Sequence, residues 1–117
     1  MSEVKSAARY RPETRLVHSG TLRSQYGETS EALFLTQGFV YDSAEQCEAR
    51  FKGEDPGYLY SRFSNPTVAM FERRMIELEG AEAARATATG MAAVTTAVLA
   101  PLKAGDHVVA AKALFGS

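Results

Sequence analysis

Tyr60 and Arg62 are the two side chains whose types and spacing most directly suggest chemistry. They lie two residues apart, so in an extended segment both side chains point to the same side. A guanidinium group makes bidentate, charge-assisted hydrogen bonds to phosphate, and a phenol adds one O–H donor. The pair therefore suits an anionic ligand. Taken alone, a tyrosine and an arginine on an exposed loop explain the pattern better.

A second candidate anion site lies at Gly90 and Met91, where a predicted strand turns into a predicted helix. The first N–H groups of a helix have no partner inside the helix, and they attract anions together with the helix dipole. Glycine also lets the backbone approach a ligand closely. On spacing alone, a βα turn that uses glycine only for its dihedral angles is the better explanation. The segment matches neither the dinucleotide-binding fingerprint nor the P-loop motif.

Helices are predicted on both sides of the Tyr60–Arg62 segment. Ser43 begins a capping box, and we expect a short helix over 43–52 that ends at Gly53. Asn65 followed by proline is a helix-start signal, and apolar residues then recur at helical spacing until Gly80. Residues 58–62 are thus expected to form an exposed loop or a short extended piece between two helices.

The rest of the chain is expected to be a loop-rich arm followed by a βαβ unit. Residues 13–31 show no clear hydrophobic periodicity, so we expect them to form the arm. The apolar run 32–41 predicts an extended segment. Residues 83–88 and 107–111 read as strands on either side of a helix over 90–100. Two strands joined in this way are expected to be parallel, with a right-handed crossover.

Composition limits the classes of function. The chain has 117 residues, of which 45% are hydrophobic and 23% charged, and a formal net charge of −1, so no strong field favours nucleic acid or an acidic membrane. No segment reads as a signal peptide or is long enough to span a bilayer. The single cysteine, Cys47, excludes an internal disulfide and favours a cytoplasmic location. We expect Cys47 and His18 to be structural, and the dispersed His and Cys residues indicate no metal site.

Two motifs in this order resemble the Cys/Met-metabolism family of pyridoxal-phosphate (PLP) enzymes. They are Tyr-Ser-Arg-Phe-Ser-Asn-Pro-Thr at 60–67 and Gly-Met-Ala-Ala at 90–93, and the resemblance extends from about residue 14 to the end of the chain. It implies an α/β protein of PLP-dependent transferase fold type I. Residues 1–62 would then be an N-terminal arm that contacts the neighbouring subunit. Residues 63–117 would begin the large, mostly parallel-sheet PLP-binding domain with its first βαβ part.

The resemblance also implies roles for individual residues. Tyr60 and Arg62 would bind the PLP phosphate of the neighbouring subunit, and the Gly90 and Met91 amides would bind the phosphate of their own subunit. Phe115 stands where the family usually has a tyrosine that stacks on the PLP ring. Phenylalanine can stack in the same way, but it has no hydroxyl for proton transfer. Lys112 is not expected to be the Schiff-base lysine, which in this family lies in a Ser/Thr-rich segment far downstream.

Phe115 and the segment 33–41 resemble the sulfhydrylase branch of the family. This implies replacement of the succinyl group of O-succinylhomoserine by sulfide, giving homocysteine in methionine biosynthesis. Cystathionine γ-synthase or γ-lyase activity is the nearest alternative. A non-catalytic PLP- or anion-binding protein, or a structural subunit, is an alternative from a different class.

The βαβ unit reads as incomplete, because no further strands follow residues 107–111. We therefore expect the sequence to be the N-terminal part of a longer protein and to be inactive by itself. The resemblance implies a homo-oligomer, commonly a dimer of dimers, that acts on a small amino-acid substrate. From the charge and composition we expect no nucleic-acid or membrane partner.

Overall fold

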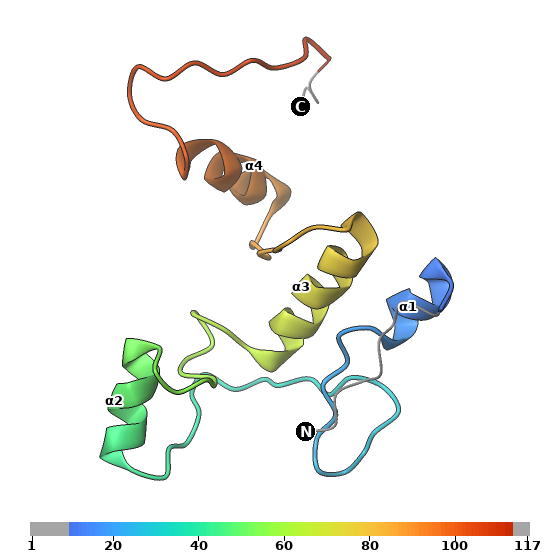
Figure 1. Ribbon diagram of the computed structural model, residues 1–117, viewed down its shortest axis with the longest axis vertical. Coiled ribbons are helices and arrows are strands. Elements are labelled where there is room, and N and C mark those ends of the chain that lie inside the picture. The colour runs from blue at the N-terminus through green and yellow to red at the C-terminus, as the bar shows by residue number, and fades with distance from the viewer. Residues whose placement is uncertain (1–9, 114–117) are drawn as a thin grey trace. The chain divides into compact units, whose positions relative to one another are not determined.

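The computed structural model describes residues 10–113, and four α-helices occur within this range (Figure 1). The helices are α1 (Pro12–His18), α2 (Ala44–Lys52), α3 (Pro66–Glu79) and α4 (Gly90–Leu99). The chain divides into two compact units, residues 1–86 and residues 87–117. The first unit contains α1, α2 and α3, and the second contains α4.

Helix α3 forms as its sequence signals predict. The Asn65 side chain accepts a hydrogen bond of 2.9 Å from the Thr67 N–H, and proline occupies the first helical position. At the other end Gly80 has a left-handed φ of 60°, and the Ala81 N–H bonds to the Ile76 carbonyl at 3.1 Å. These contacts satisfy backbone groups that the two helix ends would otherwise leave open. The predicted start and stop of this helix are confirmed.

Helix α2 is also confirmed, with a small change in its cap. The Ser43 hydroxyl accepts from the Gln46 N–H at 3.2 Å, as in a capping box. The Gln46 side chain accepts in return from the Asp42 N–H at 2.8 Å, one residue upstream of the expected partner. Gly53 ends the helix with a φ of 76°.

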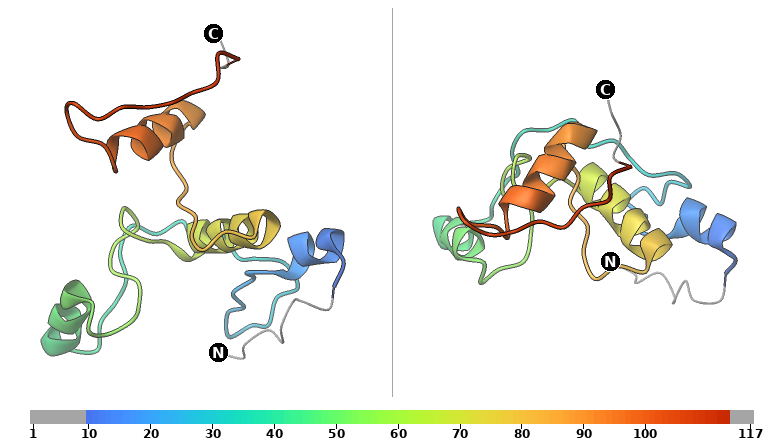
Figure 2. Two further views of the ribbon diagram at one scale, coloured as in Figure 1. Left: turned by 45° about the horizontal axis from the view of Figure 1, so that its top comes forward. Right: turned by 90° about the horizontal axis from the view of Figure 1, so that it is seen from above.

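The prediction of a loop-rich arm over 13–31 is wrong for its first residues, because α1 forms there. Helix α1 has no side-chain cap, and it is only seven residues long. Its signals are Pro12 at the first position and Glu13 in the first turn. Its apolar residues Leu16 and Val17 are adjacent and do not recur at helical spacing. The helix is stabilised by packing beside α3 (Figure 2), which a search for local periodicity does not detect.

The predicted strands over 83–88 and 107–111 are not paired in this structure. Within residues 10–113 the one β-type pairing is an isolated antiparallel bridge between Gly38 and Tyr60. The expected parallel βαβ pairing is therefore not observed, and the described backbone on both sides of α4 is irregular. A pair of strands without a larger sheet is marginally stable at best in water. The apolar side chains of the second segment are exposed accordingly, with Val109 fully accessible.

The predicted helix over 90–100 is confirmed as α4, which begins at Gly90 and ends at Leu99. Thr89 caps its start through a 3.0 Å hydrogen bond from the Ala92 N–H to the threonine hydroxyl. Among the described residues, α4 and the other helices all fall short of the length and apolar character needed to cross a membrane.

The core of the first unit lies on α3 around Met70, which is 1% exposed. Gly20 packs directly on this helix, with a φ of 74° that favours glycine. A β-carbon at Gly20 would lie 2.8 Å from the Arg73 β-carbon and 3.0 Å from the Met70 carbonyl oxygen. The close approach buries Ser19 and Thr21 on either side of the glycine.

Candidate functional site

Tyr60 and Arg62 lie in a turn that leads directly into α3. The Tyr60 carbonyl oxygen accepts hydrogen bonds from the Phe63 and Ser64 N–H groups, at 2.9 and 3.2 Å. The turn ends at Asn65, the N-cap of α3. The prediction of a loop or short extended piece over 58–62 is confirmed, with Tyr60 in the bridge and the following residues in the turn.

The residues between and after this pair fasten the turn to the extended segment 32–38. The Ser61 N–H donates to the Gln37 carbonyl at 2.9 Å, and the Ser61 hydroxyl donates to the Thr36 carbonyl. The Asn65 amide donates to the Ser61 hydroxyl and to the Phe34 carbonyl, both at 2.9 Å.

Thr67 completes this set of bonds, which we call the clamp: Ser61, Asn65 and Thr67 with their partners on residues 32–38. The Phe34 N–H donates to the Thr67 hydroxyl at 2.9 Å. Because Asn65 is 7% exposed, its bonds are made largely out of water and are costly to leave unmade. The clamp thus explains why serine, asparagine and threonine occur beside the tyrosine and the arginine.

The turn presents unused hydrogen-bond donors. The Tyr60 hydroxyl accepts from the Gln37 side-chain amide at 2.9 Å, which leaves its own proton available to a ligand. Arg62 is exposed, and its guanidinium carbon lies 4.6 Å from the Phe63 ring centroid and 5.7 Å from the Tyr60 ring centroid. Within residues 10–113 the Arg62 side chain has neither an ion pair nor a hydrogen bond. The two side chains together therefore offer donors without acceptors, which is the chemistry that an anion requires.

The start of α4 presents a second set of donors. Thr89 satisfies two helix N–H groups: its hydroxyl bonds that of Ala92 at 3.0 Å, and its carbonyl bonds that of Ala93 at 3.1 Å. The Gly90 and Met91 N–H groups have no acceptor among the described residues. A β-carbon built at Gly90 has no atom within 4 Å, so the space beside this residue is open. The two open amides are the ones that the sequence singles out.

The two donor sets belong to different units of the chain. Phe115 lies outside the described residues. His18 ends α1 and is exposed, and Cys47 is half-buried on α2, as expected for a structural thiol. No group of three or more potential metal ligands occurs in the described part of the chain.

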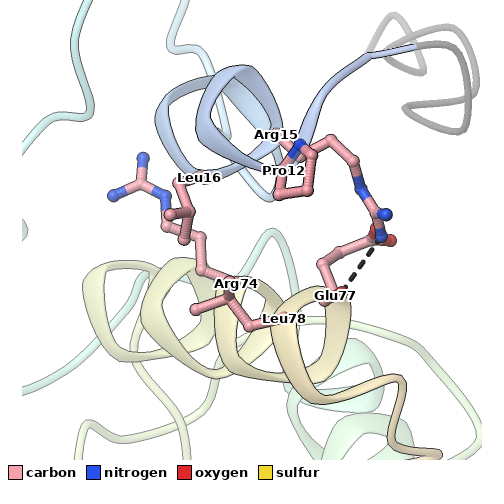
Figure 3. A pocket seen from close by; sticks show the side chains of 6 residues that line it. All are labelled: Pro12, Arg15, Leu16, Arg74, Glu77 and Leu78. Atoms are coloured by element: carbon pink, nitrogen blue, oxygen red, sulfur yellow. Dashed lines mark hydrogen bonds and ion pairs between the residues drawn. The ribbon is translucent and has the colours of Figure 1, made fainter.

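The first unit also contains a small pocket between α1 and α3, shown in Figure 3. The Arg15–Glu77 ion pair of 2.5 Å lies at one side of it. Its volume of about 80 Å³ is small for a cofactor, since ligand pockets usually measure about 300–1,000 Å³. None of the predicted phosphate-binding residues lines it; the lining residues are Pro12, Arg15, Leu16, Arg74, Glu77 and Leu78.

A second ion pair holds the arm on α3. Arg74 bonds both carboxylate oxygens of Glu31, at 2.5 and 2.7 Å, and its Nε donates to the Ser19 carbonyl at 3.2 Å. The hydrogen bonds from Arg74 lower the pKa of Glu31 from its ordinary 4.5 to about 2. This pair connects the segment after α1 to α3 and stays ionised at neutral pH.

Sequence reasoning missed the positioning residues of the turn. It found Tyr60 and Arg62 and assigned Asn65 as the start of the helix, but it gave no role to Gln37, Ser61 or Thr67, and it did not detect the bonds from the Asn65 amide. Ser61 lies between Tyr60 and Arg62 in the motif, and its hydroxyl donates to the Thr36 carbonyl, 25 residues away in the sequence. No signal pointed to Gln37, because its partner lies 23 residues away.

Comparison with known proteins found a matching family model and several relatives. A family model described as Cys/Met metabolism PLP-dependent enzyme matches residues 13–117. An O-succinylhomoserine sulfhydrylase from Mycobacterium tuberculosis is 56% identical over 101 residues, which cover 86% of this chain and 25% of that protein. An L-methionine gamma-lyase from Fusobacterium nucleatum subsp. polymorphum is 45% identical over 103 residues, covering 88% of this chain and 26% of that protein. The chain thus spans about a quarter of the length of the curated relatives it matches.

A solved structure has a similar fold. It is a candidate O-acetylhomoserine (thiol)-lyase from Campylobacter jejuni, with a TM-score of 0.72 and 28% sequence identity. The similarity covers 77% of this chain and 22% of that one. That structure contains N'-pyridoxyl-lysine-5'-monophosphate, which is PLP joined to a lysine.

Proposed function

Because the chain belongs to the Cys/Met-metabolism family of PLP-dependent enzymes, we propose that its two donor sets bind the phosphate group of PLP. Gly90 and Met91 serve the cofactor of their own subunit, and Tyr60 and Arg62 serve that of the neighbouring subunit. The observation that carries the proposal is the pair of open N–H groups at the start of α4. Thr89 caps the next two amides and leaves those of Gly90 and Met91 free for a ligand.

The residues present fit a phosphate dianion. All the free groups are donors, and the space beside Gly90 is open. The α4 dipole adds partial positive charge at the same end of the helix. Arg62 supplies a full positive charge in a planar fork that matches two phosphate oxygens. A neutral ligand would leave this charge uncompensated.

We propose that the intact enzyme exchanges the succinyl group of O-succinylhomoserine for sulfide. The γ-carbon–oxygen bond breaks, a γ-carbon–sulfur bond forms, and homocysteine and succinate are released. PLP supplies the electron sink for this chemistry, and the protein orients the cofactor. The support is the 56% identity to an O-succinylhomoserine sulfhydrylase.

A γ-lyase or cystathionine γ-synthase reaction is the second candidate. The 45% identity to an L-methionine gamma-lyase favours the lyase among these. The experiment measures two turnover rates of the intact enzyme with O-succinylhomoserine, one with sulfide and one with cysteine as the nucleophile. A separate assay measures elimination from methionine. Faster product formation with sulfide supports the sulfhydrylase reaction. A preference for cysteine, or elimination from methionine as the faster reaction, contradicts it.

A non-catalytic PLP- or anion-binding protein, or a structural subunit, is the alternative from another class. A structural role for the turn predicts that Arg62→Ala leaves cofactor affinity unchanged. The phosphate role predicts a loss of about 10- to 100-fold, since a hydrogen bond to a charged group contributes about 1.5–3 kcal/mol. Arg11→Ala, another exposed arginine, is the control.

Hybrid oligomers test the sharing of residues between subunits. One subunit carries Arg62→Ala, and its mate carries a substitution of the Schiff-base lysine. If Arg62 serves the neighbouring site, the hybrid contains one complete site, and activity returns to about half that of the unmodified enzyme. If Arg62 serves its own site, both sites are defective and the hybrid is inactive.

Other parts of the proposal rest on the family alone. Phe115 would stack on the PLP ring, and a dimer, commonly paired into a tetramer, is the smallest assembly in which Tyr60 and Arg62 reach a neighbour's cofactor. We further propose a cytoplasmic location, and the boundary between arm and large domain near residue 62. Residues 1–117 by themselves are expected to be inactive, because Lys112 does not correspond to the family's Schiff-base lysine.

A further inference from the structure

Gln37 lies where it can control the direction of the Tyr60 hydroxyl. Its side-chain amide donates a hydrogen bond of 2.9 Å to the phenol oxygen. A phenol oxygen that accepts one hydrogen bond keeps its single proton for another partner. A donor on the oxygen also polarises the O–H bond, which strengthens the hydrogen bond that the phenol makes in turn.

The backbone around Gln37 is fixed to the turn at neighbouring points. Gly38 pairs with Tyr60 in the antiparallel bridge, and the Gln37 carbonyl accepts from the Ser61 N–H at 2.9 Å. The Ser61 hydroxyl also donates to the Thr36 carbonyl. The position of the Gln37 α-carbon relative to Tyr60 is therefore set by backbone contacts, and the side chain has only to reach the phenol.

We propose that Gln37 is a positioning residue for the phosphate site: it donates to the Tyr60 hydroxyl and directs the phenol proton toward the phosphate of the neighbouring subunit's cofactor. This inference rests on the proposed function of Tyr60. It assigns to Gln37 no contact with the cofactor itself, so its whole effect on cofactor binding passes through the tyrosine.

The chemistry of the side chain makes this role specific. Glutamine has two N–H donors and can keep one on the phenol. Gln37→Leu removes the bond with little change in size. Gln37→Glu replaces the donor by an acceptor, which competes with the phosphate for the phenol proton and adds a negative charge beside it. Glutamate is therefore expected to be more harmful than leucine.

The test measures the PLP dissociation constant of the intact apoenzyme by cofactor absorbance, together with the ³¹P chemical shift of bound PLP. Tyr60→Phe is expected to weaken binding about 10-fold or more, as for a bond to a charged acceptor. Gln37→Leu is expected to weaken it about 3- to 10-fold and to move the ³¹P signal toward that of Tyr60→Phe. Gln25→Leu, the same change at an exposed loop position, should alter neither quantity.

The double variant decides whether Gln37 acts through Tyr60. In the Tyr60→Phe background the phenol oxygen is absent, so Gln37→Leu should have no further effect on affinity. Equal losses in both backgrounds would show an independent, structural effect and would overturn the inference. Unchanged affinity in Gln37→Leu, with Tyr60→Phe impaired, overturns the inference alone. Unchanged affinity in Tyr60→Phe overturns both the inference and the proposed role of Tyr60.

Discussion

Asn65 offers the sharpest test of how the turn is held, because its side chain has two separable functions. The side-chain oxygen caps α3 by accepting from the Thr67 N–H, and the side-chain amide donates to Ser61 and Phe34. An N-cap contributes about 1 kcal/mol. Each of the two donated bonds contributes about 1 kcal/mol as well. Asn65→Ala therefore removes about 3 kcal/mol from the local stability of the turn, and Asn65→Asp, which keeps the cap, removes about 2 kcal/mol.

Amide hydrogen exchange in the intact protein separates the two functions. The Thr67 amide reports on the cap, and the Ser61 amide, bonded to the Gln37 carbonyl, reports on the clamp. In Asn65→Ala both amides should exchange faster. In Asn65→Asp the Thr67 amide should stay protected, while the Ser61 amide exchanges about 30-fold faster, the factor that corresponds to about 2 kcal/mol. Slow exchange of the Ser61 amide in Asn65→Asp would refute the claim that the amide of Asn65 holds the segment.

Three further outcomes are expected. Gly20→Ala should destabilise the protein by about 2 kcal/mol or more in urea unfolding, because the new β-carbon would lie 2.8 Å from the Arg73 β-carbon on α3. The control Gly27→Ala has a similar φ of 64° but no atom within 4 Å of the new β-carbon, so it should cost only about 1 kcal/mol. Equal losses in the two variants would contradict the packing argument. The stability contributed by Glu31 is fully present above pH 4.5, because its folded-state pKa is lowered to about 2, and it is lost as the pH falls from 4.5 toward 2. Glu31→Gln should therefore make the urea-unfolding midpoint less dependent on pH over this range. An unchanged pH dependence would show that the ion pair does not form. Phe63→Leu should weaken PLP binding about 2- to 5-fold, because Arg62 loses the ring whose centroid lies 4.6 Å from its guanidinium carbon. Cofactor titration measures the PLP dissociation constant of this variant. An unchanged dissociation constant would show that the ring does not position the Arg62 cation.

Local sequence signals predicted the helices that have strong caps. For α2 and α3 the capping residue, the apolar spacing and the terminal glycine all lie within the helix or beside it. Helix α4 was likewise predicted, with Thr89 as its observed cap. Such contacts join residues two to five positions apart, so their energies can be read from sequence order.

Elements that depend on distant partners were not predictable in the same way. Helix α1 lacks a side-chain cap, and its ion pair to Glu77 joins residues 62 positions apart. The predicted strands over 83–88 and 107–111 are not paired here for a related reason. Alternating or continuous apolar residues show that a segment suits a sheet, but a ladder forms only where a partner strand supplies hydrogen bonds.

The candidate site likewise has features that the sequence predicts and features that only the fold decides. Residue type and spacing made Tyr60, Arg62, Gly90 and Met91 candidate donors for an anion, and the resemblance to a known family assigned them to a phosphate. The sequence could not show which donors stay free. The tertiary structure decided this by bringing residues 32–38 beside the turn, where the clamp and Gln37 bond to it and leave the Tyr60 proton and the Arg62 guanidinium unused. The contacts between the two segments span 23 to 33 residues, and only folding makes such residues neighbours.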